Sequence, residues 1–117
     1  MFHEIATELE AHEKTLMAMA AKYPEIAREA AKARVIYDAA WADAITLITH
    51  NFVSTETKFT VPERDALATQ KVREELETAR MAEAELDAAK KYISVLEAIL
   101  SSVQTRAKLV QMEWTSK

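Results

Sequence analysis

Apolar side chains recur along the first half of the chain at alternating steps of three and four residues. This spacing is typical of a coiled-coil seam, in which the a and d positions of each heptad face a partner helix. The seam predicts an amphipathic helix over residues 2 to about 50, and His12 is its one polar member. Its positions are Phe2, Ile5, Leu9, His12, Leu16, Met19, Tyr23, Ile26, Ala30, Ala33, Tyr37, Ala40, Ala44 and Leu47.

Pro24 lies inside this first seam, and the phase of the seam passes through it without a slip. The residues around it include no Gly, Asn, Asp or Ser that would favour a turn. A proline inside a helix removes one backbone hydrogen bond and costs about 3 kcal/mol, and long helices bend at such residues. We therefore expect one long helix with a kink at Pro24. The alternative is a break at Lys22 and Tyr23, which gives two separate helices and a three-helix bundle.

Residues 51–60 interrupt the pattern and predict a loop, because they are rich in β-branched and polar side chains. A helix start follows, with Thr60 as the N-cap, Pro62 in the first turn and Glu63 at the capping-box position. From there a second seam predicts a helix over residues 61 to about 115. Its positions are Ala79, Ala82, Leu86, Ala89, Ile93, Leu96, Leu100, Val103, Ala107, Val110 and Trp114.

Two helical arms of similar length, joined by one loop, predict an all-α fold. We expect a long antiparallel helical hairpin of the coiled-coil type that forms a single domain over residues 1–117. When the loop is taken as the centre of the register, Glu8 falls near Arg106 and Arg34 falls near Glu83. These pairs indicate the register rather than the stability, since exposed ion pairs contribute only about 0.2–1 kcal/mol each.

Further apolar residues lie outside the two seams and need another partner. A wide apolar stripe on a helix requires more than one neighbouring helix. We therefore expect self-association, with a dimer as the default and higher oligomers as alternatives, or docking of a foreign protein. The candidate interface residues are Trp41, Ile45, Ile48 and Phe52 on the first arm and Tyr92, Val95, Ile99, Leu109 and Met112 on the second.

The composition excludes several classes of protein. The chain has no Gly, which excludes glycine-rich phosphate loops, and no Cys, which excludes disulfides and thiolate metal sites. His12 and Glu8 form an i, i+4 pair, but one His and one Glu are too few ligands for a metal site. We expect no catalytic residues, no cofactor and no metal, and so no enzyme. The lack of Cys suits a cytoplasmic protein, which we expect. The acidic N-terminus predicts no targeting segment, and the short apolar runs predict no membrane span.

Charge is unevenly distributed along the chain. The net charge of −4 disfavours a wholly basic nucleic-acid binder, yet residues 90–117 carry five basic and two acidic side chains. The basic residues of this segment either neutralise the acidic first arm or contact nucleic-acid phosphates, and the first reading is favoured because charged helix faces are usually solvated. The candidate nucleic-acid contacts are Lys90, Lys91, Arg106 and Lys108.

The second arm also carries a resemblance. The segments TVPERDALA and AAKKYISVLEAILSSVQTRAKLVQMEW resemble small helical proteins encoded by bacteriophages and prophages. The closing VLEAILSSVQTRAKLVQ is similar to the end of phage recombination mediator proteins, which are oligomeric and load a recombinase onto single-stranded DNA. The resemblance implies that Arg106 and Lys108 contact single-stranded DNA. It favours a non-enzymatic, oligomeric helical scaffold or accessory protein acting in DNA recombination. The alternative function is a protein-interaction module, such as an assembly chaperone or an inhibitor of a host protein, that docks through an exposed apolar stripe.

Overall fold

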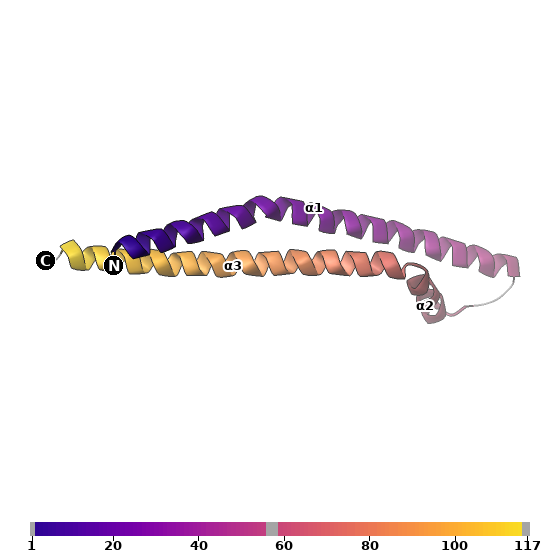
Figure 1. The fold of residues 1–117 in the computed structure, drawn as a ribbon. Helices are drawn as coiled ribbons and strands as arrows, with labels where there is room; N and C mark the ends of the chain where they lie inside the picture. Colours follow the sequence, from indigo (N-terminus) through magenta and orange to yellow (C-terminus); the bar gives the residue numbers. More distant parts are fainter. Residues whose placement is uncertain (1, 56–58, 116–117) are drawn as a thin grey trace. The chain divides into compact units, whose positions relative to one another are not determined.

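The chain folds as helices joined by short connections (Figure 1). The structure, a computed structural model, describes residues 2–55 and 59–115, and of residues 51–55 it describes the backbone alone. Helix α1 spans Phe2–Thr55, α2 spans Val61–Lys71 and α3 spans Arg73–Thr115. The predicted all-α helical hairpin is confirmed, with α1 and α3 running in opposite directions.

Helix α1 continues through Pro24 without a break. The alternative of two helices separated at Lys22 and Tyr23 is therefore wrong. Pro24 has no N–H, so the carbonyl of Ala20 lacks the backbone donor that any other residue at this position would supply. The helix persists because residues on both sides of the proline keep the seam in phase and pack against α3.

The connection between the arms is shorter than the sequence predicts, because α1 extends to Thr55. Residues 51–55 are helical despite their β-branched side chains, since propensity is a weak signal that context overrides. The start of α2 is confirmed as predicted. Thr60 has extended backbone angles, and its hydroxyl accepts a hydrogen bond from the Glu63 N–H at 3.3 Å. Pro62 lies in the first turn, where its missing N–H costs nothing.

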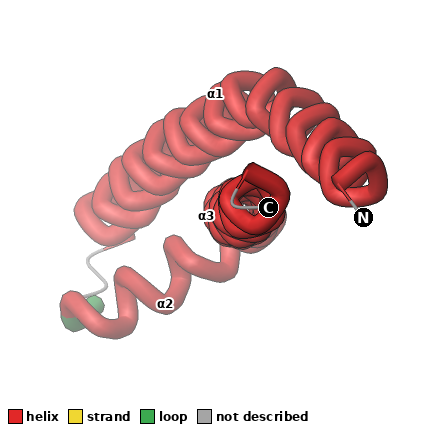
Figure 2. The backbone as a smooth tube through the Cα atoms, turned by 90° about the vertical axis from the view of Figure 1, so that its left-hand side faces the viewer, coloured by secondary structure: helices red, strands yellow, loops and turns green. Residues whose placement is uncertain are grey.

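Val72 separates α2 from α3, where the sequence predicts one uninterrupted helix. Its backbone angles, φ −107° and ψ 22°, lie outside the helical range. The Val72 N–H still donates to the Ala68 carbonyl at 3.1 Å, and the Val72 carbonyl accepts from the Leu76 N–H at 2.9 Å. The chain therefore changes direction at one residue while its hydrogen bonds are kept, and Figure 2 shows α2 and the start of α3 pointing in different directions.

The helices contribute to two compact units. The first unit joins α1 up to Ile26 to α3 from Leu86 onward, and the second runs from Ala27 to Glu85. In the first unit the two seams supply the core. The most deeply buried side chains there are Ile5, Ala89, Leu96 and Val103.

The second unit has a core where α1 meets α2. Ala44 and Ile48 of α1 pack with Ala68 and Val72, and all four are buried. The partly buried side chains of Tyr37, Ala40, Trp41, Ile45 and Leu67 pack against them. In the same unit Arg34 donates to Glu83 at 3.5 Å, as the predicted register requires.

Candidate functional site

An apolar stripe on α3 is exposed in the first unit. Tyr92, Val95 and Ile99 follow one another at steps of three and four residues, so they lie on one side of the helix. Their exposed fractions are 48%, 54% and 36%. The buried positions of α3, such as Leu96 and Val103, lie beside this stripe and face α1. The stripe is thus apolar surface that the chain's own packing leaves in contact with water.

Small residues of α1 border the stripe on the same side of the unit. The ion pair between Glu8 and Arg106 identifies that side, because Arg106 Nη2 lies 2.7 Å from Glu8 Oε1. One heptad along each helix from this pair lie Thr15 and Ile99. Thr15 and its neighbours on that side, Ala11 and Ala18, are exposed. We call the six residues together the uncharged face: Ala11, Thr15, Ala18, Tyr92, Val95 and Ile99.

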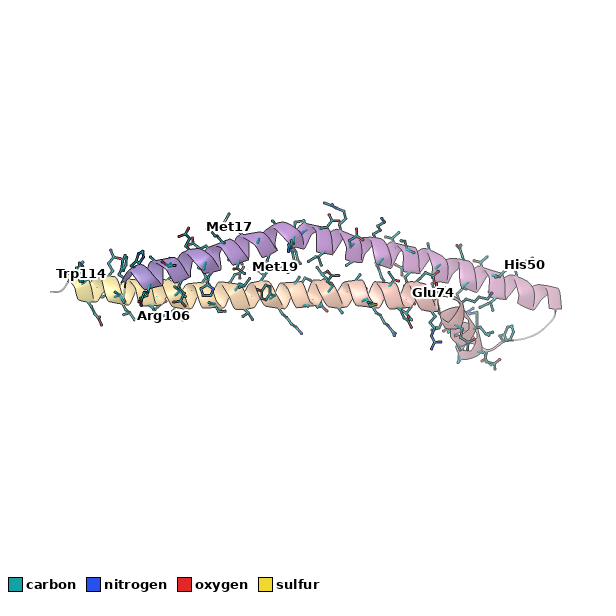
Figure 3. All side chains as sticks on the ribbon, in the orientation of Figure 1. Met17, Met19, His50, Glu74, Arg106 and Trp114 are labelled. Atoms are coloured by element: carbon teal, nitrogen blue, oxygen red, sulfur yellow. The ribbon has the colours of Figure 1, made fainter. Side chains whose placement is uncertain are left out.

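The other side of the seam carries polar side chains. Lys90, Glu97 and Gln104 recur at heptad spacing on α3 across the buried seam from the uncharged face, and all are exposed. Met17 of α1 is also exposed, at 72%, and points away from α3, whereas Met19 lies between the two helices (Figure 3). The first unit therefore has two unlike sides.

The structure divides the predicted interface residues into two groups. Ile48 is buried in the chain's own core, so the prediction that it is exposed is wrong. Trp41 and Ile45 are partly used by the same core. The physical reason is the break at Val72, which turns α2 onto this face of α1. Phe52 lies outside the residues whose side chains are described.

The α3 members of the predicted interface are exposed. Besides the stripe itself, Leu109 is 56% exposed and Met112 is 65% exposed. Trp114 is more exposed still, at 81%, on the last turns of α3 (Figure 3). The predicted seam therefore stops short of Trp114. The sequence predicts the α3 stripe but not Ala11, Thr15 and Ala18. Their only signal is the absence of charge at heptad positions beside the seam.

The predicted nucleic-acid contacts do not all lie on one side of α3. Arg106 donates to Glu8, so part of its charge is neutralised within the chain. Lys108 lies two positions further along α3, and residues two apart point to different sides of a helix. Lys90 and Lys91 are exposed and adjacent in sequence. The two residues that the phage resemblance implies, Arg106 and Lys108, thus do not face one strand together.

His12 lies beside the ion pair of Glu8 and Arg106, at one end of the uncharged face. Its Nε2 lies 3.7 Å from Glu8 Oε1, and its side chain is 28% exposed. Glu8 therefore stands between His12 and Arg106. Among the described residues, no three His, Cys, Asp or Glu side chains are grouped so that they could hold a metal ion.

A small depression lies in the second unit. Its volume is about 180 Å³, and Ile48, Thr49, Phe59 and Arg64 line it. The Arg64 Nε atom is buried without a hydrogen-bond partner, and Asp65 Oδ1 is 3.8 Å away. The volume is below the range of roughly 300–1,000 Å³ that holds small-molecule ligands. We assign it no binding role.

Comparison of the chain with protein-family models, with curated proteins and with solved structures gives no match. In the part of the chain that the structure describes, no helix combines the length and the hydrophobicity that a membrane span requires.

Proposed function

We propose that this protein is a non-enzymatic helical scaffold that works by self-association through its uncharged face. The exposure of Tyr92, Val95 and Ile99 along one side of α3 is the observation that supports this proposal. Burial of apolar surface is worth roughly 25 cal/mol per Å², and contiguous apolar patches on helices commonly mark interaction sites. A helix with such a stripe gains stability when a further helix covers it.

A role in DNA recombination is the most specific form of this proposal. Association would bring several copies of Lys90, Lys91 and Lys108 together, and each phosphate contact adds to one salt-dependent affinity. A single copy offers few such contacts, because Arg106 is paired with Glu8. Binding of single-stranded DNA is therefore expected of the assembled form, and it should weaken steeply as salt is raised.

The alternative function, docking on a foreign protein, has less support. The predicted docking surface for this function includes Trp41, Ile45 and Ile48 of the first arm. Ile48 is buried within the chain, and the other two residues pack against the same core. A foreign partner would have to use the α3 stripe instead. The oligomeric state of the free protein separates the two functions.

The test is the mass of the protein in solution, measured by light scattering on a sizing column at low and at high salt. We expect the wild-type protein to have a mass that is a multiple of 13.2 kDa. The variant Val95→Glu should be monomeric, because it places a charge in the centre of the face. The matched control is Met17→Glu, an apolar residue of α1 that is even more exposed than Val95 and lies outside the face. It should leave the mass unchanged.

A monomeric wild-type protein would overturn the scaffold proposal and favour a foreign partner. Equal effects of Val95→Glu and Met17→Glu would place the contact elsewhere on the chain. The DNA role is tested on the wild-type protein by fluorescence anisotropy with a labelled single-stranded oligonucleotide. Binding that is absent even at low salt would remove the recombination role while leaving the scaffold intact.

A further inference from the structure

We infer that two copies of the chain pair through the uncharged face about a two-fold axis parallel to the helices, so that α3 of each copy packs against α1 of the other. This inference rests on the proposed function, since it requires that the face binds a second copy. It adds which helices of the two copies are in contact and which of their residues lie opposite each other.

The heights of residues along the two helices follow from the contact between Glu8 and Arg106. One heptad further along each helix, Thr15 lies level with Ile99. Between this level and the next heptad, Ala18 of α1 lies close to the level of Val95. All these positions belong to the first unit. At these two levels the face therefore has large side chains on α3 and small ones on α1.

The difference in size selects the symmetry. A two-fold axis parallel to the helices places α3 of one copy over α1 of its partner at the same height, so Val95 meets the partner's Ala18 and Ile99 meets the partner's Thr15. A two-fold axis perpendicular to the helices places α3 over α3 and α1 over α1. The spacing between packed helices, about 8–10 Å, depends on the side chains in the contact. Only the parallel axis gives the two new contacts the same mixture of large and small residues, and hence equal spacing.

Polar groups on the face are compatible with burial in this arrangement. The Thr15 hydroxyl donates to the Ala11 carbonyl of its own helix at 3.0 Å, so it needs no partner from the second copy. Buried polar groups are costly only when they lack a hydrogen bond. Tyr92 lies level with Lys22 at the edge of the face, where its hydroxyl can reach water.

Charges at the other end of the face are complementary under the same symmetry. Glu8 and Arg106 of one copy come level with the same two residues of its partner. Arg106 then lies across from the partner's Glu8, and Glu8 lies across from the partner's Arg106. Four charges of alternating sign result, which favours this register over one in which like charges meet.

The chain has no cysteine, so engineered thiols report the geometry directly. One preparation carries Ala18→Cys and another, distinguished by a size tag, carries Val95→Cys. A disulfide requires Cβ atoms about 3.5–4.5 Å apart, which demands direct contact. We expect oxidation of the mixed preparations to give the crosslinked pair of one tagged and one untagged chain. Neither preparation alone should crosslink, because in a parallel-axis dimer like positions lie across the diagonal.

The control replaces Ala18→Cys with Met17→Cys, which lies outside the face and should not crosslink to the Val95→Cys chain. Both substituted positions are exposed, and circular dichroism together with light scattering verifies that each variant stays helical and dimeric. Crosslinking of the Val95→Cys chain to itself would overturn the inference in favour of the perpendicular axis. A dimeric mass without the mixed crosslink would overturn it while the proposed function stands. A monomeric mass would instead overturn both.

Discussion

Arg106 and Glu8 lie 98 positions apart in the sequence, yet the Arg106 Nη2 atom donates a hydrogen bond to Glu8 Oε1 at 2.7 Å. This contact reports the register of α1 against α3 in the first unit, because shifting either helix by one residue would separate the two groups. It also shows which residues, one heptad further along each helix, lie level with each other. The small side chains of α1 that lie beside the α3 stripe are identified in this way.

The contact indicates the register but should contribute little to stability. Both side chains are about half exposed, at 41% for Glu8 and 51% for Arg106. We expect a double-mutant cycle with Glu8→Gln and Arg106→Gln to give a coupling energy of about 0.2–1 kcal/mol that diminishes at high salt. Chemical unfolding of the four proteins measures it. The control cycle pairs Glu8→Gln with Lys108→Gln, which lies two positions from Arg106 and should show no coupling. Coupling well above this range would mean that the pair is more shielded from water than its exposure indicates.

The stability of the first unit should depend on the apolar residues buried in the seam, and not on its apolar residues in general. Leu96 and Leu109 are the same residue type on the same helix, but Leu96 is 5% exposed and Leu109 is 56% exposed. We expect Leu96→Ala to lower the free energy of unfolding by about 3 kcal/mol, since it leaves a cavity. Leu109→Ala should change it by less than about 0.5 kcal/mol.

Thermal and chemical unfolding at one fixed protein concentration gives both values, because association makes the apparent stability depend on concentration. Equal losses for Leu96→Ala and Leu109→Ala would contradict the burial that separates the two residues. A loss at Leu109 alone would indicate that the end of α3 is covered by a further copy.

Most of the seam could be predicted from the sequence, and the place where prediction fails has a local cause. The heptad steps predict Leu47 as a core residue, but Leu47 is 46% exposed and Ile48 is buried. The heptad rule assumes one partner helix in one continuous register. The break at Val72 ends that register, so α2 packs against α1 at a different angle. Ile48 therefore lies in the contact in place of Leu47. The break depends on the backbone conformation of one β-branched residue, which gives no periodic signal. The sequence therefore could not reveal the break.

The candidate site was predictable only on its apolar side. Tyr92, Val95 and Ile99 are visible in the sequence because large apolar residues outside a seam require an explanation. Ala11 and Ala18 give no such signal, since alanine is common throughout both helices. Their membership of the face follows from the three-dimensional contact between Glu8 and Arg106.

The cap of α2 should contribute measurably to stability. The Thr60 hydroxyl accepts from the Glu63 N–H, which otherwise has no partner in the first turn. Replacing an N-cap Thr by Ala costs about 1 kcal/mol, whereas Ser and Asp keep the acceptor. We expect Thr60→Ala to lower the free energy of unfolding by this amount and Thr60→Asp to restore it. Urea unfolding followed by circular dichroism measures the difference. A Thr60→Asp variant as unstable as Thr60→Ala would mean that the hydroxyl is not the acceptor that matters.

Pro24 gives the sharpest test of the continuous first helix. The chain has two prolines, and they occupy opposite situations: Pro24 lies inside α1 and Pro62 lies in the first turn of α2. In a helix interior Pro is about 3 kcal/mol less favourable than Ala, and the restriction of the unfolded chain that it provides returns roughly 0.4–1 kcal/mol. Pro24→Ala should therefore raise the free energy of unfolding by about 2 kcal/mol, because it restores a donor for the Ala20 carbonyl.

Pro62→Ala is the matched control. A proline in the first turn loses no hydrogen bond, so its replacement should leave stability unchanged or lower it slightly. Chemical unfolding of the two variants beside the wild type gives the comparison. If Pro24→Ala behaved like Pro62→Ala, Pro24 would stand at a helix start in solution, and the first arm would consist of two helices. A clear gain at Pro24 alone requires that the backbone hydrogen bonds of α1 continue on both sides of it.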